Sequence, residues 1–332
     1  QPTPPQASTR SRSHYFLLIA VLNLAFRKVY QRYLLADMLI SLTLSQSELC
    51  MRNFDAFDKL ARNKDKNKNT DLRGHNLLVL APHADDEIFC IPHGKYFESK
   101  GYCITVLFLS GSIHRYLEAK NSCKILEWTY IDANDLGQQY VDGLFHQNLP
   151  NLIRSLKNIL NQFSVVLCPA LEGGHQDHDS TFVACMIALS NQTHCEPFFY
   201  KTYTATGRWK FFEVFSKDDH YSAVNFIPYI ALSRPFWGTR IVLAFHVYRS
   251  QWTSWIALLP AMIFSYIGGS KDVLYSLGSL DYCTALACTL DTNSSALYEL
   301  HRKCAKHDWL SHVRSIILQS IDDASHCNLY KS

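Results

Sequence analysis

Residues 77–87 read LLVLAPHADDE, and this stretch decides the fold of the chain. It opens with an unbroken apolar run, which is typical of a strand that is buried on both faces of a parallel sheet. Residue types that bind metals follow at once, beginning with His83. Because an open α/β sheet builds its site where strands end, the stretch predicts a central strand with a functional site directly behind it.

A second stretch of the same kind lies further along the chain. The apolar residues 165–168 are followed by His175, Gln176, Asp177 and His178. Either cluster alone would more often be a helix cap or a pair of histidines on one helix face. Together, each behind a strand of the same predicted sheet, they favour a metal site at one sheet edge.

Apolar periodicity predicts alternating strands and helices from residue 76 onward. Strands are expected at 77–81, 102–109, 128–131, 164–169 and 197–204. Helices are expected at 87–99, 115–127, 149–163 and 179–190, with residues 170–178 as the loop that carries the site. After residue 206 the pattern is weaker and favours helices at 239–249, 252–266 and 295–320. The predicted fold class is α/β, a Rossmann-like parallel sheet flanked by helices.

The segment before this pattern differs in composition. Residues 1–13 are rich in Pro, Ser and Gln, which predicts a disordered start. Residues 15–60 have helix-like apolar spacing, and residues 62–69 form a lysine-rich polar linker. We therefore expect an N-terminal helical extension within residues 1–72 and an α/β domain with a helical C-terminal part over residues 73–332.

Charge and cysteine content narrow the functional classes. The chain of 332 residues has a net charge of +3, which is too small to indicate a nucleic-acid partner. Its 11 cysteines include no C-x-x-C pair, so we expect reduced thiols and a cytoplasmic location. The uncharged stretch 251–270 leaves three interpretations open, which are a buried helix, a surface in peripheral contact with a membrane, and a membrane span.

The two clusters contain the groups that a hydrolytic metal centre needs. His83, one neighbouring aspartate and His178 can hold a divalent ion and leave a fourth position for water, as in catalytic zinc sites. The other aspartate can act as a general base, because a metal ion lowers the pKa of bound water toward ~7. A further histidine can support the oxyanion or protonate the leaving amine, and Asp177 can orient one imidazole.

These residues resemble a known family. Residues 81–87 resemble the AHPDDE motif of the PIG-L/LmbE-like zinc deacetylases, and residues 175–178 resemble that family's HPDH motif. Arg115-x-x-Glu118 and Tyr248-x-Ser250-Gln251 resemble, more weakly, its R-x-x-E helix and its late H-x-S-Q segment. The resemblance implies a Rossmann-like fold and hydrolysis of an N-acetyl group on an amino sugar of the N-acetylglucosamine type.

The resemblance also implies how the metal would be held and used. Carried over by position, the zinc ligands would be His83, Asp86 and His178, although such a site also accepts iron, cobalt or manganese. Asp85 would be the general base.

Further positions follow from the same resemblance. His175 would stabilise the oxyanion or act as an acid, with Asp177 orienting it, and Arg115 would contact the substrate. Tyr248 stands where the family has histidine and is expected either near the substrate or among the residues behind those that contact it. Two prolines of the family motifs are replaced by alanine and glutamine, so slightly looser turns are expected with the chemistry retained.

Two rival functions remain open from the sequence. The first keeps the metal and changes the bond, as an amidase that cleaves a larger acyl group or a thiol-sugar conjugate. The second is a sugar-binding protein without catalysis that has the same fold. In each case the expected partner is an amino sugar or a glycoconjugate, and the acceptor can be lipid-linked.

Overall fold

A computed structural model describes residues 76–190, 194–204, 213–214, 226–232, 236–267, 271–277 and 306–329. The disordered start, the helical extension and the linker expected within residues 1–72 lie outside these ranges, and they stay predictions. The same holds for the part of the helix expected at 295–320 that precedes residue 306.

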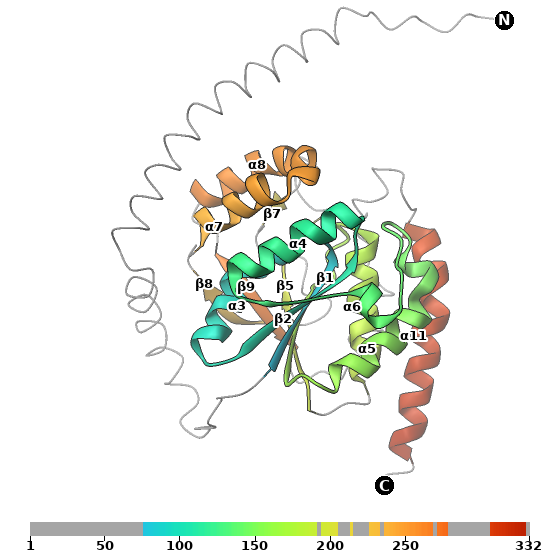
Figure 1. Cartoon of the computed structure of the whole chain (residues 1–332). Coiled ribbons are helices and arrows are strands. Elements are labelled where there is room, and N and C mark those ends of the chain that lie inside the picture. The colour runs from blue at the N-terminus through green and yellow to red at the C-terminus, as the bar shows by residue number, and fades with distance from the viewer. Residues whose placement is uncertain are drawn as a thin grey trace, which may run out of the picture. The chain divides into compact units, whose positions relative to one another are not determined.

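A seven-stranded sheet with the order β3-β2-β1-β4-β5-β9-β8 forms the centre of the domain (Figure 1). Its strands are β1 (Asn76–His83), β2 (Cys103–Ser110), β3 (Thr129–Asp132), β4 (Val165–Pro169), β5 (Glu196–Tyr200), β9 (Asp272–Leu277) and β8 (Phe226–Leu232). The strands β1 to β5 pair in parallel, as the sequence predicts. A separate two-stranded sheet pairs β6 (Tyr203–Thr204) with β7 (Glu213–Val214).

The expectation of a wholly parallel sheet is wrong at one edge. There β9 pairs antiparallel with both β5 and β8. Sequence patterns do not predict β8, because Pro228 interrupts it and the register shifts between Pro228 and Ile230. A proline within an apolar run argues against a central strand and is tolerated at edges and bulges. The short β9 is only partly buried, so its periodicity is also weak.

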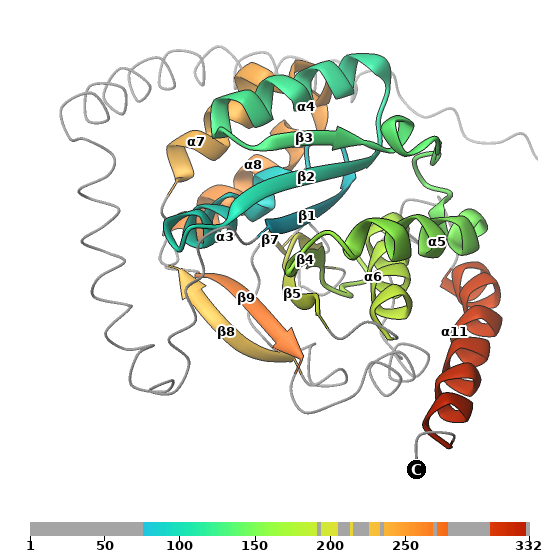
Figure 2. The same cartoon turned by 60° about the horizontal axis from the view of Figure 1, so that its bottom comes forward.

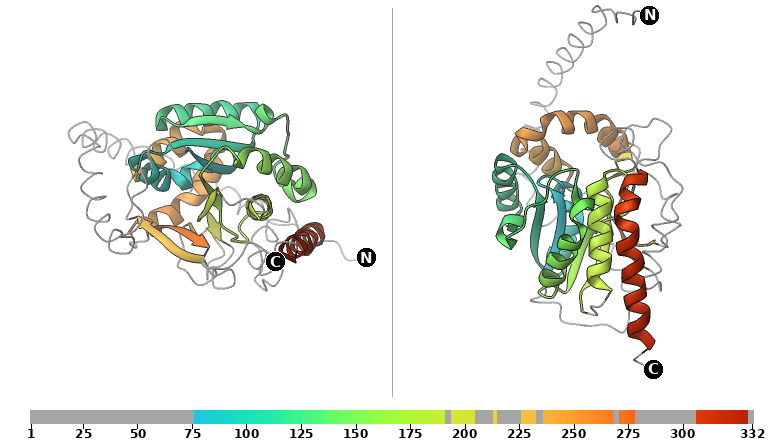
Figure 3. Two further views of the ribbon diagram at one scale, coloured as in Figure 1. Left: turned by 90° about the horizontal axis from the view of Figure 1, so that it is seen from below. Right: turned by 90° about the vertical axis from the view of Figure 1, so that its right-hand side faces the viewer.

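Helices cover both faces of the sheet. The helices α3 (Glu87–Ser99) and α4 (Ile113–Leu126) lie over one face, and α5 (Leu149–Leu160) and α6 (Gln176–Leu189) lie over the other (Figure 2). Residues 77–81 of β1 are fully buried between these layers. All 14 residues of α6 are buried as well. The reason is that α5 and α11 (Lys306–Leu329) pack along its outer side (Figure 3).

The strand order reverses between β1 and β4. The chain leaves β1 toward β2 on one side and leaves β4 toward β5 on the other. Such a switch point opens a crevice at the carboxyl ends of its two strands, because the following helices lie on opposite faces. His83, the last residue of β1, and the first turn of α6 therefore meet at this place.

The observed helix bounds correct two expectations. The helix expected at 179–190 begins at Gln176, so His178 lies in the first turn of a helix rather than in a loop. His175 caps this helix, since its side chain accepts the backbone N–H of Asp177. The helix expected at 239–249 is broken into α7 (Trp237–Val242), a π-helical turn Leu243–Val247 and a 3-10 turn Arg249–Gln251.

The uncharged stretch 251–270 contains the 16-residue helix α8 (Trp252–Ile267). This helix buries Trp255, while Trp252 and Ile256 are partly exposed. Within the described part of the chain, no helix combines the length and the apolar character that crossing a bilayer requires.

A buried arginine links the antiparallel edge of the sheet to helix α3. Pro92 lies inside α3 and lacks the N–H that would bind the carbonyl of Ile88. Arg240 supplies the missing donor, with Nε 3.0 Å from the Ile88 oxygen and Nη2 2.8 Å from that of Phe89. Its Nη1 also lies 2.9 Å from a carboxylate oxygen of Asp272 at the start of β9.

Replacing this arginine should destabilise the domain strongly. We expect Arg240→Met to lower the free energy of unfolding by about 3–5 kcal/mol, because Asp272 would be left as a buried charge without its partner. Urea unfolding followed by circular dichroism measures this loss. The exposed Arg154 provides the control, and Arg154→Met should change stability by no more than about 0.5 kcal/mol. Equal stability of the two variants would contradict this role of Arg240.

Candidate metal and catalytic site

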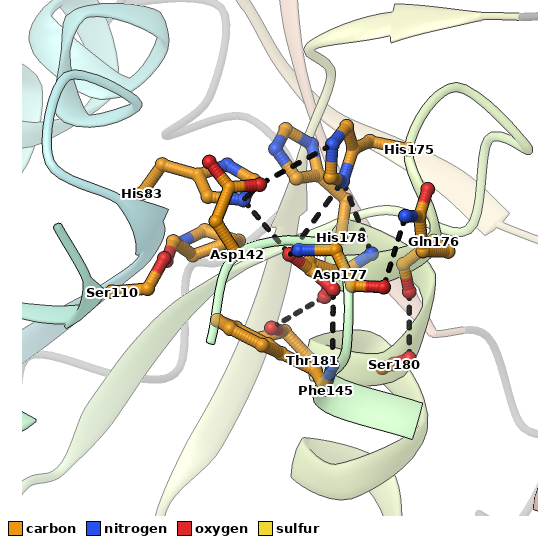
Figure 4. Close-up of polar contacts among 12 residues, drawn as sticks. His83, Ser110, Asp142, Phe145, His175, Gln176, Asp177, His178, Ser180 and Thr181 are labelled. Carbon is orange, nitrogen blue, oxygen red and sulfur yellow. Dashed lines mark hydrogen bonds and ion pairs between the residues drawn. The ribbon is translucent and has the colours of Figure 1, made fainter. Parts of the chain in front are cut away.

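Three imidazole rings converge where β1 ends and α6 begins (Figure 4). They belong to His83, His175 and His178, and one nitrogen of each ring lies within 4.8 Å of the others. The ring centre of His83 is 4.7 Å from that of His175 and 5.3 Å from that of His178. The fold thus brings together the two clusters that are far apart in the sequence.

The carboxylate of Asp86 lies between two of these rings. Its Oδ2 atom is 3.1 Å from Nδ1 of His83 and 3.1 Å from Nε2 of His178. The same oxygen accepts the backbone N–H of His83 at 2.8 Å. Burial alone would raise the pKa of Asp86, but the imidazoles of His178 and His83 outweigh burial and hold this pKa well below its usual range.

Asp177 supports the site from the interior. Its buried carboxylate accepts the backbone N–H groups of Gly143 at 2.6 Å and Phe145 at 3.1 Å. Its Oδ2 also lies 3.0 Å from Nε2 of His83, compared with 3.9 Å from Nδ1 of His175. The expectation that Asp177 orients His175 is therefore not what the geometry favours, because the closer ring is that of His83.

These contacts indicate which nitrogen of each ring carries a proton. Both ring nitrogens of His83 face carboxylates, which only accept hydrogen bonds: Nε2 lies 3.0 Å from Asp177 and Nδ1 lies 3.1 Å from Asp86. In the metal-free protein each nitrogen of this ring therefore carries a proton. Burial would lower the pKa of His83, but hydrogen bonds to Asp177 and Asp86 outweigh burial and raise it to about 10 in the metal-free protein. Nδ1 of His175 accepts the backbone N–H of Asp177, which leaves Nε2 as the donor of the neutral ring.

Asp85 occupies an unusual backbone position in the turn between β1 and α3. Its φ angle is 156°, which residues other than glycine seldom adopt. Its Oδ1 atom accepts Nη2 of Arg115 at 2.7 Å. Burial raises the pKa of Asp85 to about 6, with the Arg115 guanidinium opposing the shift. A carboxylate with such a pKa can accept a proton near neutral pH.

Asp142 joins the cluster from a loop that sequence reasoning does not single out. Its Oδ1 lies 3.5 Å from Nε2 of His83 and 4.0 Å from Nε2 of His175, and its Oδ2 lies 3.4 Å from Arg115. Its side chain is 47% exposed. The one local signal is the following Gly143, whose φ of 87° marks a tight turn.

Tyr248 lies behind the cluster and not in it. Its side chain is fully buried, and its hydroxyl donates to Glu87 at 2.5 Å, as does the hydroxyl of Ser122. Burial raises the pKa of Glu87 to about 8 despite these two hydrogen bonds. The position expected to contact substrate therefore packs against the last residue of the first motif.

The two weaker motifs touch each other. Glu118 accepts the backbone N–H of Ser250 at 2.9 Å and its hydroxyl at 2.5 Å. The contact joins α4 to the segment before α8.

The two residues that replace motif prolines each make a hydrogen bond that proline lacks. The backbone N–H of Ala84 donates to the carbonyl of Ser110 at 3.0 Å. The side-chain amide of Gln176 donates to the carbonyl of Gly143 at 3.1 Å. Hydrogen bonds to neighbouring segments thus hold both turns in place of pyrrolidine rings.

The donor set fits a divalent metal ion. Two imidazole nitrogens and a carboxylate oxygen are the ligands of many catalytic zinc sites. The two histidines that bracket Asp86 are each buried, which excludes competing solvent from most of the site. The His/Asp cluster can therefore bind a metal.

Comparison with known proteins finds one family similarity. Residues 78–189 match the family described as PIG-L, GlcNAc-PI de-N-acetylase. This part of the α/β domain is therefore similar to the PIG-L/LmbE-like family that its motifs resemble. No curated protein sequence matches the chain at a significant level.

Several solved structures are similar to the chain. The N,N'-diacetylchitobiose deacetylase from Pyrococcus horikoshii is 15% identical, with 69% of this chain and 92% of that chain covered and a TM-score of 0.42. A deacetylase of teicoplanin biosynthesis is 14% identical, with coverages of 62% and 99% and a TM-score of 0.42. GalB, a 4-carboxy-2-hydroxymuconate hydratase from Pseudomonas putida KT2440, is 12% identical, with coverages of 62% and 96% and a TM-score of 0.39.

Removing the charge of Asp177 should loosen the loop that it holds. We expect Asp177→Asn to lower the free energy of unfolding of the metal-free protein by about 1–3 kcal/mol. The two carboxylate oxygens accept hydrogen bonds from His83, Gly143 and Phe145, whereas an amide has only one oxygen to accept them. Urea unfolding in the presence of chelator measures the change. Asp142→Asn in the same loop is the control and should have little effect, because its carboxylate is half exposed.

The pH dependence of the stability difference between wild type and Asp177→Asn tests whether the charge of Asp177 is its cause. Burial would raise the pKa of Asp177, but the hydrogen bond from His83 outweighs burial and lowers it. The ionised form therefore adds stability above the unfolded pKa of about 3.9, and this contribution is lost as the pH falls through the folded value. Wild type and Asp177→Asn should differ fully at neutral pH and converge in acid. A difference that grows in acid would exclude this explanation.

Proposed function

We propose that this protein is a zinc-dependent hydrolase that removes the N-acetyl group from an amino sugar or its conjugate. The observation that carries this proposal is the position of the Asp86 carboxylate between Nδ1 of His83 and Nε2 of His178. Beside it stands Asp85, a second carboxylate with the pKa of a base. The family match over residues 78–189 supports the reaction type, since that family is described as a de-N-acetylase.

Zinc would be held by Nδ1 of His83, Oδ2 of Asp86 and Nε2 of His178. When bound, the ion supplies a Lewis acid that polarises the acetyl carbonyl and makes water a stronger acid. Once Nδ1 of His83 has lost its proton, the hydrogen bond from Nε2–H to Asp177 would hold the tautomer whose Nδ1 carries the electron pair for the metal. The chemistry of the donor set also admits iron, cobalt or manganese.

Asp85 is proposed as the general base. Its carboxylate takes the proton from water as the water attacks the acetyl carbon. The guanidinium of Arg115, 2.7 Å away, holds the carboxylate in one orientation. With a pKa of about 6, Asp85 is ionised at neutral pH and still basic enough to accept the proton.

His175 is proposed as the acid of the reaction. Its Nδ1 is occupied by the backbone N–H of Asp177, so Nε2–H is the donor that faces the site. This N–H can stabilise the oxyanion and then protonate the leaving amine. Arg115 and Asp142 stand beside it, and their charged groups suit the hydroxyl groups of a sugar.

Exposed apolar side chains beside the site support peripheral contact with a membrane and a lipid-linked acceptor. Ile113 and Leu117 at the start of α4 are 79% and 56% exposed, and Trp252 on α8 is 40% exposed. The contact between Glu118 and Ser250 brings these two helices together. Tryptophan and aliphatic residues of this kind insert at the boundary between lipid headgroups and acyl chains.

The experiment that tests the function pairs metal content with acetate release. Purified protein is offered N-acetylglucosamine, its glycosides and its phosphatidylinositol conjugate, with and without chelator. Acetate release that chelator abolishes and zinc restores is expected. Bound zinc with release of a larger acyl acid would favour an amidase, and bound zinc without hydrolysis would favour a sugar-binding protein. Absence of metal binding would overturn the proposal.

Replacing the proposed base should separate binding from catalysis. Asp85→Asn keeps the shape of the side chain and removes its basicity, so turnover should fall by about 10²-fold or more. Zinc stoichiometry should stay the same, because Asp85 is not a proposed ligand. Glu196→Gln, an exposed change at the start of β5, is the control and should keep full activity. Full turnover of Asp85→Asn would remove Asp85 as the base.

Membrane contact can be tested with vesicles of phosphatidylcholine and phosphatidylinositol. The double variant Ile113→Ser with Leu117→Ser should bind these vesicles several-fold more weakly than wild type, because it removes apolar area that binding would bury. Sedimentation with the vesicles measures binding. Leu318→Ser, an exposed change on α11, is the matched control. If all three proteins sediment alike, the apolar side chains beside the site do not contact the membrane.

A further inference from the structure

A threonine beyond the metal cluster contacts the ring of His178 on the side that faces away from Asp86. Thr202 follows β5 and is 1% exposed. Its Oγ1 atom lies 3.0 Å from Nδ1 of His178. The other ring nitrogen, Nε2, lies 3.1 Å from the carboxylate of Asp86. Whichever nitrogen of His178 carries the proton therefore decides whether Nε2 can bind a metal.

Glu172 contacts both the backbone N–H and the hydroxyl of this threonine. Glu172, in the loop after β4, accepts the backbone N–H of Thr202 at 2.8 Å through Oε1. Its other oxygen lies 3.5 Å from Thr202 Oγ1, at the outer limit of a hydrogen bond. The loop itself is fixed, since Asp179 accepts the backbone N–H groups of Glu172 and Gly173 at 3.2 Å each.

With a metal at Nε2 of His178 in place of a proton, the protons in this chain of contacts would have one consistent arrangement. The Glu172 carboxylate has no proton to donate, so the single hydroxyl proton of Thr202 points toward it. The oxygen of Thr202 can then only accept from His178, which requires the ring proton to be on Nδ1. The electron pair of the neutral ring is then on Nε2, the nitrogen that faces Asp86.

We propose that Thr202, held by Glu172, is a positioning residue that keeps His178 in the tautomer able to bind the metal. The proposal rests on the metal site of the proposed function and adds two residues that the sequence motifs do not include. Each of the two proposed histidine ligands then has a hydrogen-bond partner at the ring nitrogen that does not face the metal. With the metal bound, Asp177 would hold the tautomer of His83, and Thr202 with Glu172 would hold that of His178.

Three variants test this hydrogen-bond relay, which runs from Glu172 through Thr202 to His178. Thr202→Val has nearly the shape of threonine without the hydroxyl, and Thr202→Ser keeps the hydroxyl with a smaller side chain. Glu172→Gln keeps an oxygen for the backbone N–H of Thr202, but its amide donates to the hydroxyl. The hydroxyl proton is then free to point at His178 and to favour the wrong tautomer.

Zinc affinity and the ring tautomer are the two readouts. Competition with a chromophoric chelator should show affinity about 10–100-fold weaker for Thr202→Val and for Glu172→Gln, and close to wild type for Thr202→Ser. Nitrogen-15 NMR of the metal-free proteins at alkaline pH should show a larger share of the His178 proton on Nδ1 in wild type and Thr202→Ser than in the other two variants, because Asp86 attracts the proton toward Nε2 in all of them. All metal-free variants should unfold at similar urea concentrations.

The outcomes separate the relay from the function it serves. Wild-type zinc affinity in Thr202→Val, or an equal share of the His178 proton on Nδ1 in wild type and Thr202→Val, would overturn the relay while leaving the metal site in place. Loss of affinity that Thr202→Ser fails to restore would also overturn it, because packing rather than the hydroxyl would then be the cause. If wild type binds no zinc, the proposed function fails, and the NMR tautomers still decide the relay.

Discussion

The site depends on the parallel pairing of β1 with β4. Leu77, Leu78 and Val79 lie opposite Val165, Val166 and Leu167 in this pairing. The register brings the carboxyl ends of both strands to one sheet edge, where the helices that follow leave on opposite faces. A parallel pair cannot be closed by a short turn, so nearly ninety residues of helix and strand separate the two motifs in the chain. Their chemistry exists only once the sheet has formed.

The buried carboxylates at this sheet edge are stabilised because each of them faces an imidazole, a guanidinium or a backbone N–H group. Burial by itself disfavours the ionised form of Asp86 and Asp177, yet both pKa values are lowered, because imidazoles and backbone N–H groups surround them. Asp85 has fewer such partners, and its pKa rises instead. Neighbouring carboxylates on one turn thereby differ in acidity, which suits the roles of ligand and base proposed for them. The difference comes from their surroundings, since the side chains are identical.

The elements that the sequence predicts are those with a strong local signal. Strand β1, helix α3 and the histidine motifs follow from apolar runs and residue types within short windows. Asp142, Thr202 and Arg240 carry no such signal, because each acts on residues from a distant segment. The same holds for β8 and β9, because β9 pairs antiparallel with the distant strands β5 and β8. Their roles depend on tertiary contacts that periodicity does not encode.

The rigidity of the site comes from hydrogen bonds that converge on one loop. Gly143 donates its N–H to Asp177 and accepts the amide of Gln176, while Phe145 donates to the other oxygen of Asp177. A side chain at Gly143 would approach Gln176 to 3.2 Å, and the positive φ there also favours glycine. This loop carries Asp142 and borders His83, so the carboxylate of Asp177 that contacts the His83 ring also holds the loop with the exposed Asp142. The positions of the proposed metal ligand His83 and of Asp142 are thereby coupled through Asp177.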